Sequence, residues 1–276
     1  MNKKIIITVS SVALVILCAF ILNRMLRNGF SSNSKISSDG VSFSELNAQA
    51  KEAESKGELL KAQSIYQKLV SEFSSSPEVM SWQKKKEELN IKLLFSPQAT
   101  ANSKIYEIKP GDTLARIAKE FNTTIELIMK SNNLASDRIM PGKKIKVWTA
   151  PFNILVDKSQ NILVLKTKDE EIIKTYVVAT GANNSTPVGT FTIIDRIPNP
   201  PWFKPGAAKP IPAGDPENIL GTRWLGISVP SYGIHGTTEP QSLGKQATQG
   251  CVRMANSDVE ELYAIVPKGT EVIIVD

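Results

Sequence analysis

Histidine and cysteine are the scarcest functional residues of this sequence, which has one histidine and two cysteines in 276 residues. His235 and Cys251 lie sixteen positions apart in one glycine-containing segment, and Cys18 lies near the N-terminus. One histidine and one cysteine cannot supply the three or four protein ligands that zinc requires unless carboxylates complete the set. We therefore expect no metal site, and we expect no cofactor.

Acidic residues are absent from the first 30 positions, which contain four basic residues: Lys3, Lys4, Arg24 and Arg27. Without these four, the 33 basic residues of the chain fall to 29, against 27 acidic ones. The pI of about 9.1 therefore reflects the N-terminus, and the rest of the chain is nearly neutral. This distribution argues against nucleic-acid binding, which requires a basic surface.

An uncharged apolar run of 18 residues, 5–22, lies between these basic residues. It is long enough to cross a bilayer as a helix. A cleaved signal peptide is the alternative, but the run ends in Asn23-Arg24 without a small-residue cleavage site. We expect residues 1–30 to form an uncleaved single-pass anchor in the cytoplasmic membrane. Everything after about residue 28 would lie outside the cytoplasm.

Cys251 then has no partner for a disulfide, because Cys18 falls inside the predicted membrane helix. An unpaired cysteine in an oxidising compartment is a liability unless it is buried or used. Two interpretations follow: a buried, inert thiol, or a nucleophile that a neighbouring imidazole activates.

Residues 31–41 are rich in serine and are predicted to be a flexible spacer. Residues 42–95 are predicted to form a helical hairpin, with Pro77 ending its second helix. Apolar residues recur at helical spacing on either side of Gly57: Leu46, Ala50, Ala53, Leu60, Ile65, Leu69 and Phe73. The hairpin resembles one tetratricopeptide-like repeat, although stacked repeats normally number about three. A helical stalk, or a hairpin that docks a protein partner, is the alternative.

Residues 104–148 are predicted to form a compact β-α-α-β unit. An alternating strand leads into a Pro110-Gly111-Asp112 turn, after which Asp112 or Thr113 can cap a helix. A second cap and helix begin at Asn122-Thr123-Thr124, and a last strand follows Pro141-Gly142. With YEIKPGDTLARIAKEFNTT and NNLASDRIMPGKKIKV in this order, the unit resembles a LysM domain.

The LysM resemblance implies binding to N-acetylglucosamine-containing glycans such as peptidoglycan. The implied contacts are in the loop after the first strand and in the loop before the last one. The residues concerned are Gly111, Asp112, Thr113, Leu114, Asn133 and Met140. A packing module without glycan affinity is the alternative.

Residues 151–276 are predicted to be a mainly-β domain with one late helix. Runs of β-branched residues alternate with polar turns at 158–160 and 168–170. Seven prolines in 197–216 exclude a central strand and predict a long ordered loop. Ser257 and Glu260 have the spacing of a capping box at the start of the late helix.

His235 and Cys251 have the residue types of a catalytic pair, since an imidazole can act as base for a thiol. Gly236 and Gly250 let the backbone turn sharply beside them, and N–H groups at Gly250 can face a developing oxyanion. Glu239 is the only acidic residue within the segment. A backbone carbonyl is therefore the alternative group for orienting the imidazole.

The segment YGIHGTTEPQSLGKQATQGCVRM resembles the signature of the YkuD-type L,D-transpeptidases, and TPVGTF and LGTRWLGIS resemble further segments of that family. The resemblance implies that Cys251 is the nucleophile, His235 its general base and the Gly236 carbonyl the group that orients the imidazole. It also implies substrate or oxyanion contacts, which we assign to Gly250, Arg253 and Trp202. Ordering of the site is the other role that the resemblance implies for Arg253. Trp224 is predicted to pack in the core, with a place in the substrate groove as the alternative.

The sequence departs from the family pattern at Gln249, where many members carry a second histidine. The implied reaction cuts a peptidoglycan tetrapeptide stem after residue 3, releases D-alanine and forms a 3-3 cross-link. Hydrolysis by an L,D-carboxypeptidase, attachment of a protein to the wall, and an inactive peptidoglycan-binding scaffold are the alternatives. The expected fold class is multidomain: a transmembrane helix, an α-helical hairpin, a small βααβ LysM domain and a mainly-β L,D-transpeptidase domain.

Overall fold

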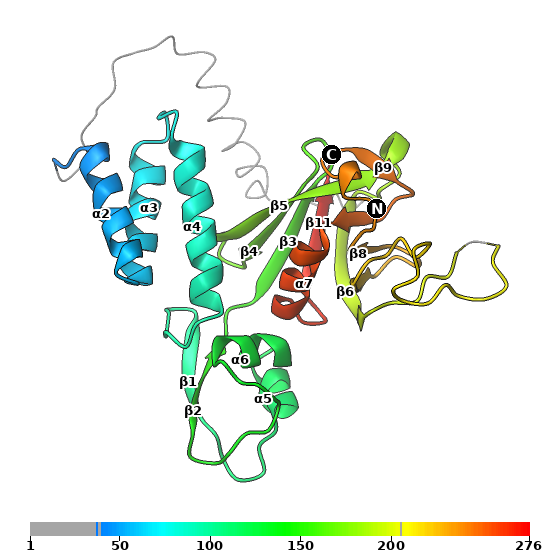
Figure 1. The fold of residues 1–276 in the computed structure, drawn as a ribbon, viewed down its shortest axis with the longest axis horizontal. Helices are drawn as coiled ribbons and strands as arrows, with labels where there is room; N and C mark the ends of the chain where they lie inside the picture. Colours follow the sequence, from blue (N-terminus) through cyan, green and yellow to red (C-terminus); the bar gives the residue numbers. More distant parts are fainter. Residues whose placement is uncertain (1–36, 38–39, 205) are drawn as a thin grey trace, which may run out of the picture. The chain divides into compact units, whose positions relative to one another are not determined.

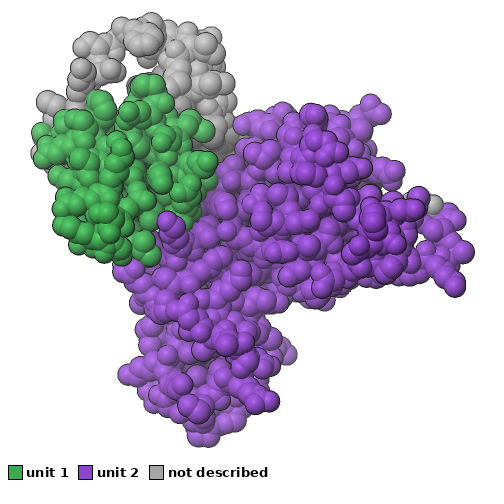
Figure 2. Space-filling model, viewed as in Figure 1, with its two compact units in different colours: residues 1–89 green, residues 90–276 purple. Residues whose placement is uncertain are grey.

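The computed structural model describes residue 37, residues 40–204 and residues 206–276. The membrane anchor predicted over residues 5–22 and most of the predicted spacer over 31–41 lie outside the described residues. Within the described ranges, no helix combines the length and the apolar character that crossing a membrane requires. The chain divides into two compact units, residues 1–89 and 90–276 (Figure 2), which are described separately.

The first unit contains helices α2 (Phe43–Ser55) and α3 (Leu59–Glu72) and most of helix α4 (Val79–Leu94) (Figure 1). Ser42 caps α2, because its hydroxyl accepts a hydrogen bond from the Glu45 N–H at 3.2 Å. The core of this unit is apolar and includes three packed aromatic rings, those of Phe43, Phe73 and Trp82. The remaining buried members are Leu46, Ala50, Ala53, Ala62, Tyr66, Leu69, Val79 and Leu89.

The prediction of a two-helix hairpin over 42–95 was incomplete, because α4 is a third helix. Its sequence contains the charged run KKKEE, which interrupts the apolar spacing that marks α2 and α3. In the second unit, the C-terminal end of α4 is held by Lys146, whose ammonium donates to the carbonyls of Leu93 at 2.6 Å and Ser96 at 3.0 Å. Burial lowers the pKa of Lys146 to about 8. Hydrogen bonds to these terminal carbonyls satisfy acceptors that have no partner within the helix.

The predicted β-α-α-β unit is confirmed. Its elements are β1 (Ser103–Glu107), α5 (Leu114–Glu120), α6 (Ile125–Ser131) and β2 (Lys144–Trp148), with β1 antiparallel to β2. Thr113, not Asp112, caps α5 by accepting from the Arg116 N–H at 3.1 Å. Thr124 caps α6 by accepting from the Leu127 N–H at 2.9 Å. Two threonine caps thus set where both short helices begin.

The mainly-β domain is built on one nine-stranded sheet, in the order β10-β8-β7-β6-β11-β3-β4-β5-β9. The strands are β3 (Phe152–Asp157), β4 (Ile162–Thr167), β5 (Ile172–Gly181), β6 (Gly189–Pro198), β7 (Arg223–Ile227), β8 (Gly233–His235), β9 (Gln246–Thr248), β10 (Val252–Met254) and β11 (Glu271–Val275). Strand β10 also pairs with β5, so the sheet closes on itself. Its apolar core includes Ile154, Leu165, Val178, Leu225, Ile234 and Val272.

Helix α7 (Asn256–Ile265) packs on this sheet and contributes Val259, Leu262 and Ile265 to its core. The capping-box prediction was wrong: Ala255 occupies the N-cap and makes no side-chain cap bond. Ser257 lies inside the helix, because the chain turns into α7 directly after β10 ends at Met254.

The segment between β6 and β7 is a loop, as its prolines predicted. Its only strand-like pairing among the described residues is a bridge between Trp202 and Ile211. The buried Asn218 side chain holds the loop together by donating to the carbonyls of Pro200 at 2.9 Å and Pro212 at 3.1 Å.

The β-α-α-β unit packs directly against the mainly-β domain. The Thr124 hydroxyl that caps α6 also donates to the carbonyl of Ala264 in α7. Leu127 of α6 belongs to the core of the mainly-β domain. Arg196 of β6 donates to the Tyr263 carbonyl at 2.6 Å and pairs with Glu126 of α6 at 3.2 Å. Apolar burial and hydrogen bonds therefore join the two modules.

Candidate active site

Parallel pairing of β8 with β10 brings His235 and Cys251 together. In this register Val252 lies opposite Ile234, and Arg253 lies opposite His235. Cys251 immediately precedes β10, so it lies at the end of the pair, close to the strand that carries the imidazole. Strand pairing thus brings two residues that are sixteen positions apart in the sequence to neighbouring strands. The Cys251 thiol donates to the Ser231 carbonyl at 3.7 Å, and its described hydrogen bonds do not include one to His235.

The imidazole of His235 is buried, with 3% of the residue exposed. Its Nδ1 lies 2.6 Å from the Gly236 carbonyl oxygen. Because a carbonyl oxygen only accepts, Nδ1 carries the proton in this bond and Nε2 of the neutral ring is left to act as a base.

Burial lowers the pKa of His235 to about 4, and the nearby charge of Arg253 lowers it further. The carbonyls of Gly236 and Leu220 act in the opposite direction. Burial also raises the pKa of the Cys251 thiol, against the opposing influence of the Gly233 backbone and of Arg253. At neutral pH both groups are therefore uncharged, and the pair is a thiol beside a neutral base.

Protonation of His235 is expected to destabilise the fold as the pH falls from about 6.5 to 4. In this window the unfolded chain, with an ordinary histidine pKa, binds a proton that the folded chain excludes, so stability rises with pH and is lost on acidification. The loss should reach roughly 3 kcal/mol at the acid end of the window.

Urea unfolding of the wild type and of His235→Gln between pH 4 and 8 measures this loss. Only the wild type should show the histidine contribution. Carboxyl groups that also titrate in this range should do so equally in both proteins. Asp258 is one of them, because burial raises its pKa. Parallel stability curves for the two proteins would contradict the assignment.

Gly250 shapes the turn that presents Cys251. Its φ is +122°, and a Cβ there would lie 2.5 Å from the ring of Tyr232, so both conformation and space require glycine. The Thr248 hydroxyl closes the turn by donating to the Cys251 carbonyl at 2.6 Å and accepting from the Gly250 N–H at 3.1 Å. The Gly250 N–H is thus already engaged in this structure, and Gly250 contributes the shape of the turn.

Arg253 is 5% exposed and lies in β10. Its Nη1 donates to the Glu239 carboxylate at 2.7 Å and to the Ser242 hydroxyl at 3.0 Å. The only acidic residue of the segment therefore pairs with arginine and not with the imidazole. Of the two roles that the sequence suggested for Arg253, this geometry favours ordering the site.

Family models match two parts of the chain: the L,D-transpeptidase catalytic domain, YkuD, over residues 151–274, and the LysM domain over 106–148. YkuD of Bacillus licheniformis, described as an L,D-transpeptidase, is 38% identical over 178 residues, which are 62% of this chain and 98% of the relative. The chain belongs to the YkuD-type L,D-transpeptidases.

YkuD of Bacillus subtilis is 36% identical over 176 residues, covering 61% of this L,D-transpeptidase and 97% of the relative. Among solved structures, an L,D-transpeptidase from Mycobacterium smegmatis matches at 16% identity with a TM-score of 0.39. That match covers 49% of this chain and 64% of the other.

Gln249 is exposed in the turn that precedes Cys251. The hydrogen bonds that close the turn are made by Thr248 and Gly250, on either side of it. Glutamine at this position is therefore compatible with an intact turn, and His235 remains the only imidazole. Within the described residues, no group of three or more His, Cys, Asp or Glu side chains could hold a metal.

Trp224 is partly exposed and stacks on the imidazole of His235, with ring centroids 5.8 Å apart and an interplanar angle of 19°. The prediction that it packs in the core missed this contact. A Cβ at Gly226 or Gly233 would lie within 3 Å of the indole, so these two paired glycines leave the space that the ring occupies. The glycines were the sequence signal, but only the strand register shows which ring they accommodate.

Trp202 is placed in the loop between β6 and β7. Its backbone pairs with Ile211, and the ammonium of Lys204 lies 5.8 Å from the centre of its ring. No hydrogen bond or ring contact joins it to Cys251 or His235 among the described residues. Its assignment to the substrate groove stays a prediction.

The predicted glycan-binding residues of the LysM domain have different surroundings. Leu114 is buried in the LysM core, and Thr113 is the cap of α5. Asp112 accepts from the Tyr106 hydroxyl at 2.9 Å and pairs with Arg116. Gly111, Asn133 and Met140 are exposed. None of these three residues caps a helix or forms an ion pair through a side chain in the described structure.

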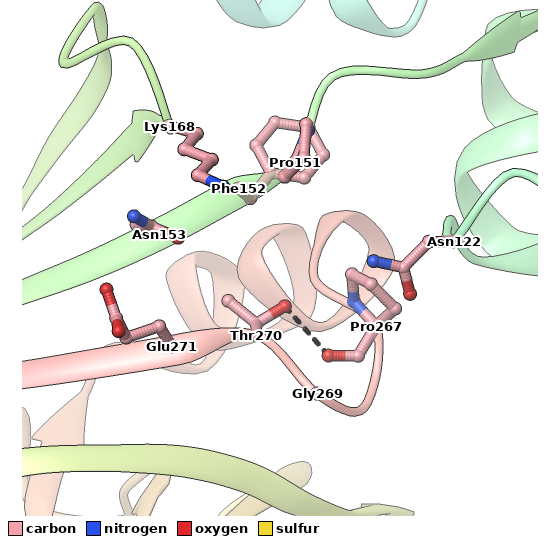
Figure 3. A pocket seen from close by; sticks show the side chains of 9 residues that line it. All are labelled: Asn122, Pro151, Phe152, Asn153, Lys168, Pro267, Gly269, Thr270 and Glu271. Carbon is pink, nitrogen blue, oxygen red and sulfur yellow. Dashed lines mark hydrogen bonds between the residues drawn. The ribbon is translucent and has the colours of Figure 1, made fainter.

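A pocket of about 220 Å³ lies elsewhere in the transpeptidase domain, where β3 and β11 begin beside the LysM domain (Figure 3). Its lining residues are Asn122, Pro151, Phe152, Asn153, Lys168, Pro267, Gly269, Thr270 and Glu271. None of them is a candidate catalytic residue. The pocket is thus distinct from the Cys251 site.

Proposed function

We propose that the protein is a membrane-anchored peptidoglycan L,D-transpeptidase that works through a cysteine acyl-enzyme and forms 3-3 cross-links. The observation that carries this proposal is the geometry of the buried His235 imidazole. Its Nδ1 lies 2.6 Å from the Gly236 carbonyl oxygen. Its strand, β8, pairs with β10, which begins directly after Cys251. This arrangement leaves Nε2 of the only histidine as the base beside the only cysteine outside the N-terminal apolar run.

In the first step, Sγ of Cys251 attacks the carbonyl carbon between the third and fourth residues of a tetrapeptide stem. The thiol proton passes to Nε2 of His235, which converts a neutral thiol into the attacking thiolate only as the S–C bond forms. The C–N bond then breaks, and His235 returns the proton to the leaving amine of D-alanine. A thioester between Cys251 and the tripeptide stem remains.

In the second step, an amine of a neighbouring stem attacks the thioester carbonyl. Nε2 of His235 accepts the proton of this amine as the new amide bond forms. The C–S bond then breaks, and His235 returns the proton to the departing sulfur, which regenerates the Cys251 thiol. Water in place of the amine would give an L,D-carboxypeptidase, and an amine on a protein would attach that protein to the wall. The acceptor therefore decides among products that share one acyl-enzyme.

The other parts of the chain support action at the cell wall. The apolar run 5–22 would anchor the protein in the membrane, with the transpeptidase domain on the outer side. The LysM domain would hold the enzyme on glycan strands through the exposed loops at Gly111 and Met140. Its packing against the transpeptidase domain would keep bound glycan and reacting stem at a fixed separation.

Incubation of the full chain with purified disaccharide-tetrapeptide, followed by mass analysis of the muropeptides, tests the proposal. We expect loss of D-alanine together with dimers joined by a 3-3 bond. Tripeptide without dimers would instead establish a carboxypeptidase. No turnover by folded protein would contradict the enzymatic proposal and favour a wall-binding scaffold.

A further inference from the structure

We propose that Asn256 is a positioning residue that fixes the His235 base through one shared peptide group. The inference rests on the proposed function for its catalytic meaning. Asn256 is the first residue of α7, twenty positions after Gly236. Its carboxamide points back to the segment that follows the histidine, and the family resemblance assigned it no role.

The Asn256 carboxamide makes three hydrogen bonds to backbone on two segments. Its Oδ1 accepts from the N–H of Thr237 at 3.0 Å and from the N–H of Thr222 at 3.3 Å. Its Nδ2 donates to the Thr237 carbonyl at 2.9 Å. The side chain therefore ties the strand end after His235 to the residue that precedes β7.

The peptide group between Gly236 and Thr237 connects Asn256 to the base. Its carbonyl oxygen belongs to Gly236 and accepts from Nδ1 of His235, whereas its N–H belongs to Thr237 and donates to Asn256. The two groups lie in one rigid plane. A bond that fixes the N–H therefore also fixes the direction of the carbonyl that orients the imidazole, and linked hydrogen bonds polarise each other.

Gly236 shows that the site is shaped around this carboxamide. A Cβ at Gly236 would lie 2.1 Å from Oδ1 of Asn256. Gly236 does not have a positive φ, so its backbone conformation does not require glycine. The glycine after the histidine is needed because Asn256 occupies the adjacent space.

A helix-capping role does not account for Asn256. The N-cap of α7 is Ala255, and the three bonds of the carboxamide all go to residues outside the helix. Asparagine at the first helical position therefore contributes nothing to its own helix through this side chain. Its bonds serve the segments on either side of the base.

The test compares full-length wild type with Asn256→Ala and Asn256→Asp. Alanine removes all three bonds, whereas aspartate has nearly the same shape and keeps both accepting bonds. With disaccharide-tetrapeptide, we expect kcat of Asn256→Ala to fall about 10- to 100-fold with KM changed less than about threefold, the range seen when a partner that orients a reactive group is lost. Asn256→Asp should recover most of kcat.

A readout independent of activity is available because His235 is the only histidine. In protein labelled with ¹⁵N-histidine, one imidazole gives all the signals, and their shifts report the tautomer. Wild type and Asn256→Asp should show the Nδ1–H form, and Asn256→Ala a mixture of tautomers. If Asn256→Ala does not fold, the inference requires Asn256→Asp to keep the Nδ1–H form with an altered Nδ1 proton shift, since its anionic oxygen accepts more strongly.

The matched control is Asn132→Ala in the LysM domain. Asn132 also makes three backbone bonds, accepting from the Lys146 N–H and donating to the carbonyls of Ile128 and Lys146. Its loss should lower stability and leave both the histidine tautomer and kcat unchanged.

The two readouts separate failure of the inference from failure of the proposed function. If the wild type shows no turnover but its histidine tautomer changes in Asn256→Ala, the positioning role holds and the proposed reaction is overturned. Turnover by wild type, with kcat and tautomer unchanged in Asn256→Ala, would overturn the positioning role.

Discussion

Replacement of Cys251 with alanine is expected to lower D-alanine release and cross-link formation by at least about 1,000-fold. In the proposed mechanism Cys251 is the nucleophile of the acylation step, and removal of a nucleophile from such a catalytic unit leaves only the contribution of binding and electrostatics. Parallel reactions of wild type and variant with disaccharide-tetrapeptide measure the loss. Intact mass of the wild type should also show the tripeptide thioester, absent from the variant.

The same replacement should change stability little. The thiol is partly exposed and contacts the Ser231 carbonyl at 3.7 Å, a weak hydrogen bond, so we expect a loss of no more than about 1 kcal/mol. Cys18→Ala is the matched control, because Cys18 is the only other cysteine of the chain. It should leave turnover intact. Substantial residual turnover in folded Cys251→Ala would remove the thiol from the mechanism.

Gly250→Ala is expected to cause the second large effect, a loss of at least about 100-fold in kcat/KM with several kcal/mol of stability. A left-handed φ of +122° strains any residue with a Cβ, and this Cβ would also overlap the ring of Tyr232 at 2.5 Å. The turn must shift to relieve the overlap. A shift there moves Cys251 from the end of the strand pair, and small misplacements of a reacting group reduce rates strongly.

Gly269→Ala is the control that separates the effect of backbone strain from the effect of steric overlap in Gly250→Ala. Gly269 has a φ of +90° in the same domain, but a Cβ there would meet nothing within 4 Å. It should cost about 1 kcal/mol from backbone strain and leave kcat/KM unchanged. Thermal unfolding and kinetics on both variants check the contrast. If Gly250→Ala behaved like Gly269→Ala, packing against Tyr232 would not control the position of the nucleophile.

Local signals predicted the fold best where they act within a few residues. Thr113 and Thr124 begin both LysM helices, and their caps are visible in the sequence. The third helix of the first unit was hidden by its run of charged residues, which disrupts apolar spacing. The start of α7 was misplaced because tertiary constraints, with β10 ending at Met254, override the capping preference of Ser257.

The scarcity of histidine and cysteine, together with the sequence motif around them, predicted part of the candidate site. One histidine and one nearby unpaired cysteine predict the pair, and strand pairing shows how they meet. The stack of Trp224 on His235 could not be predicted, since it depends on the register of β7 against β8. Gly236 was predicted to allow a sharp turn, whereas its φ is not positive and the contact that requires glycine comes from Asn256.

The shared hydroxyl of Thr124 bears on how the enzyme can be dissected. The family boundary falls near residue 150, but α6 supplies Leu127 to the transpeptidase core and Thr124 to the end of α7. A fragment that begins at residue 151 would uncover apolar surface and leave the Ala264 carbonyl without its partner. Ile91 and Leu94 of α4 belong to the same core, so the smallest fragment that keeps the whole core begins before residue 91. Exchange of LysM modules between relatives must carry the matching face of α6 with it.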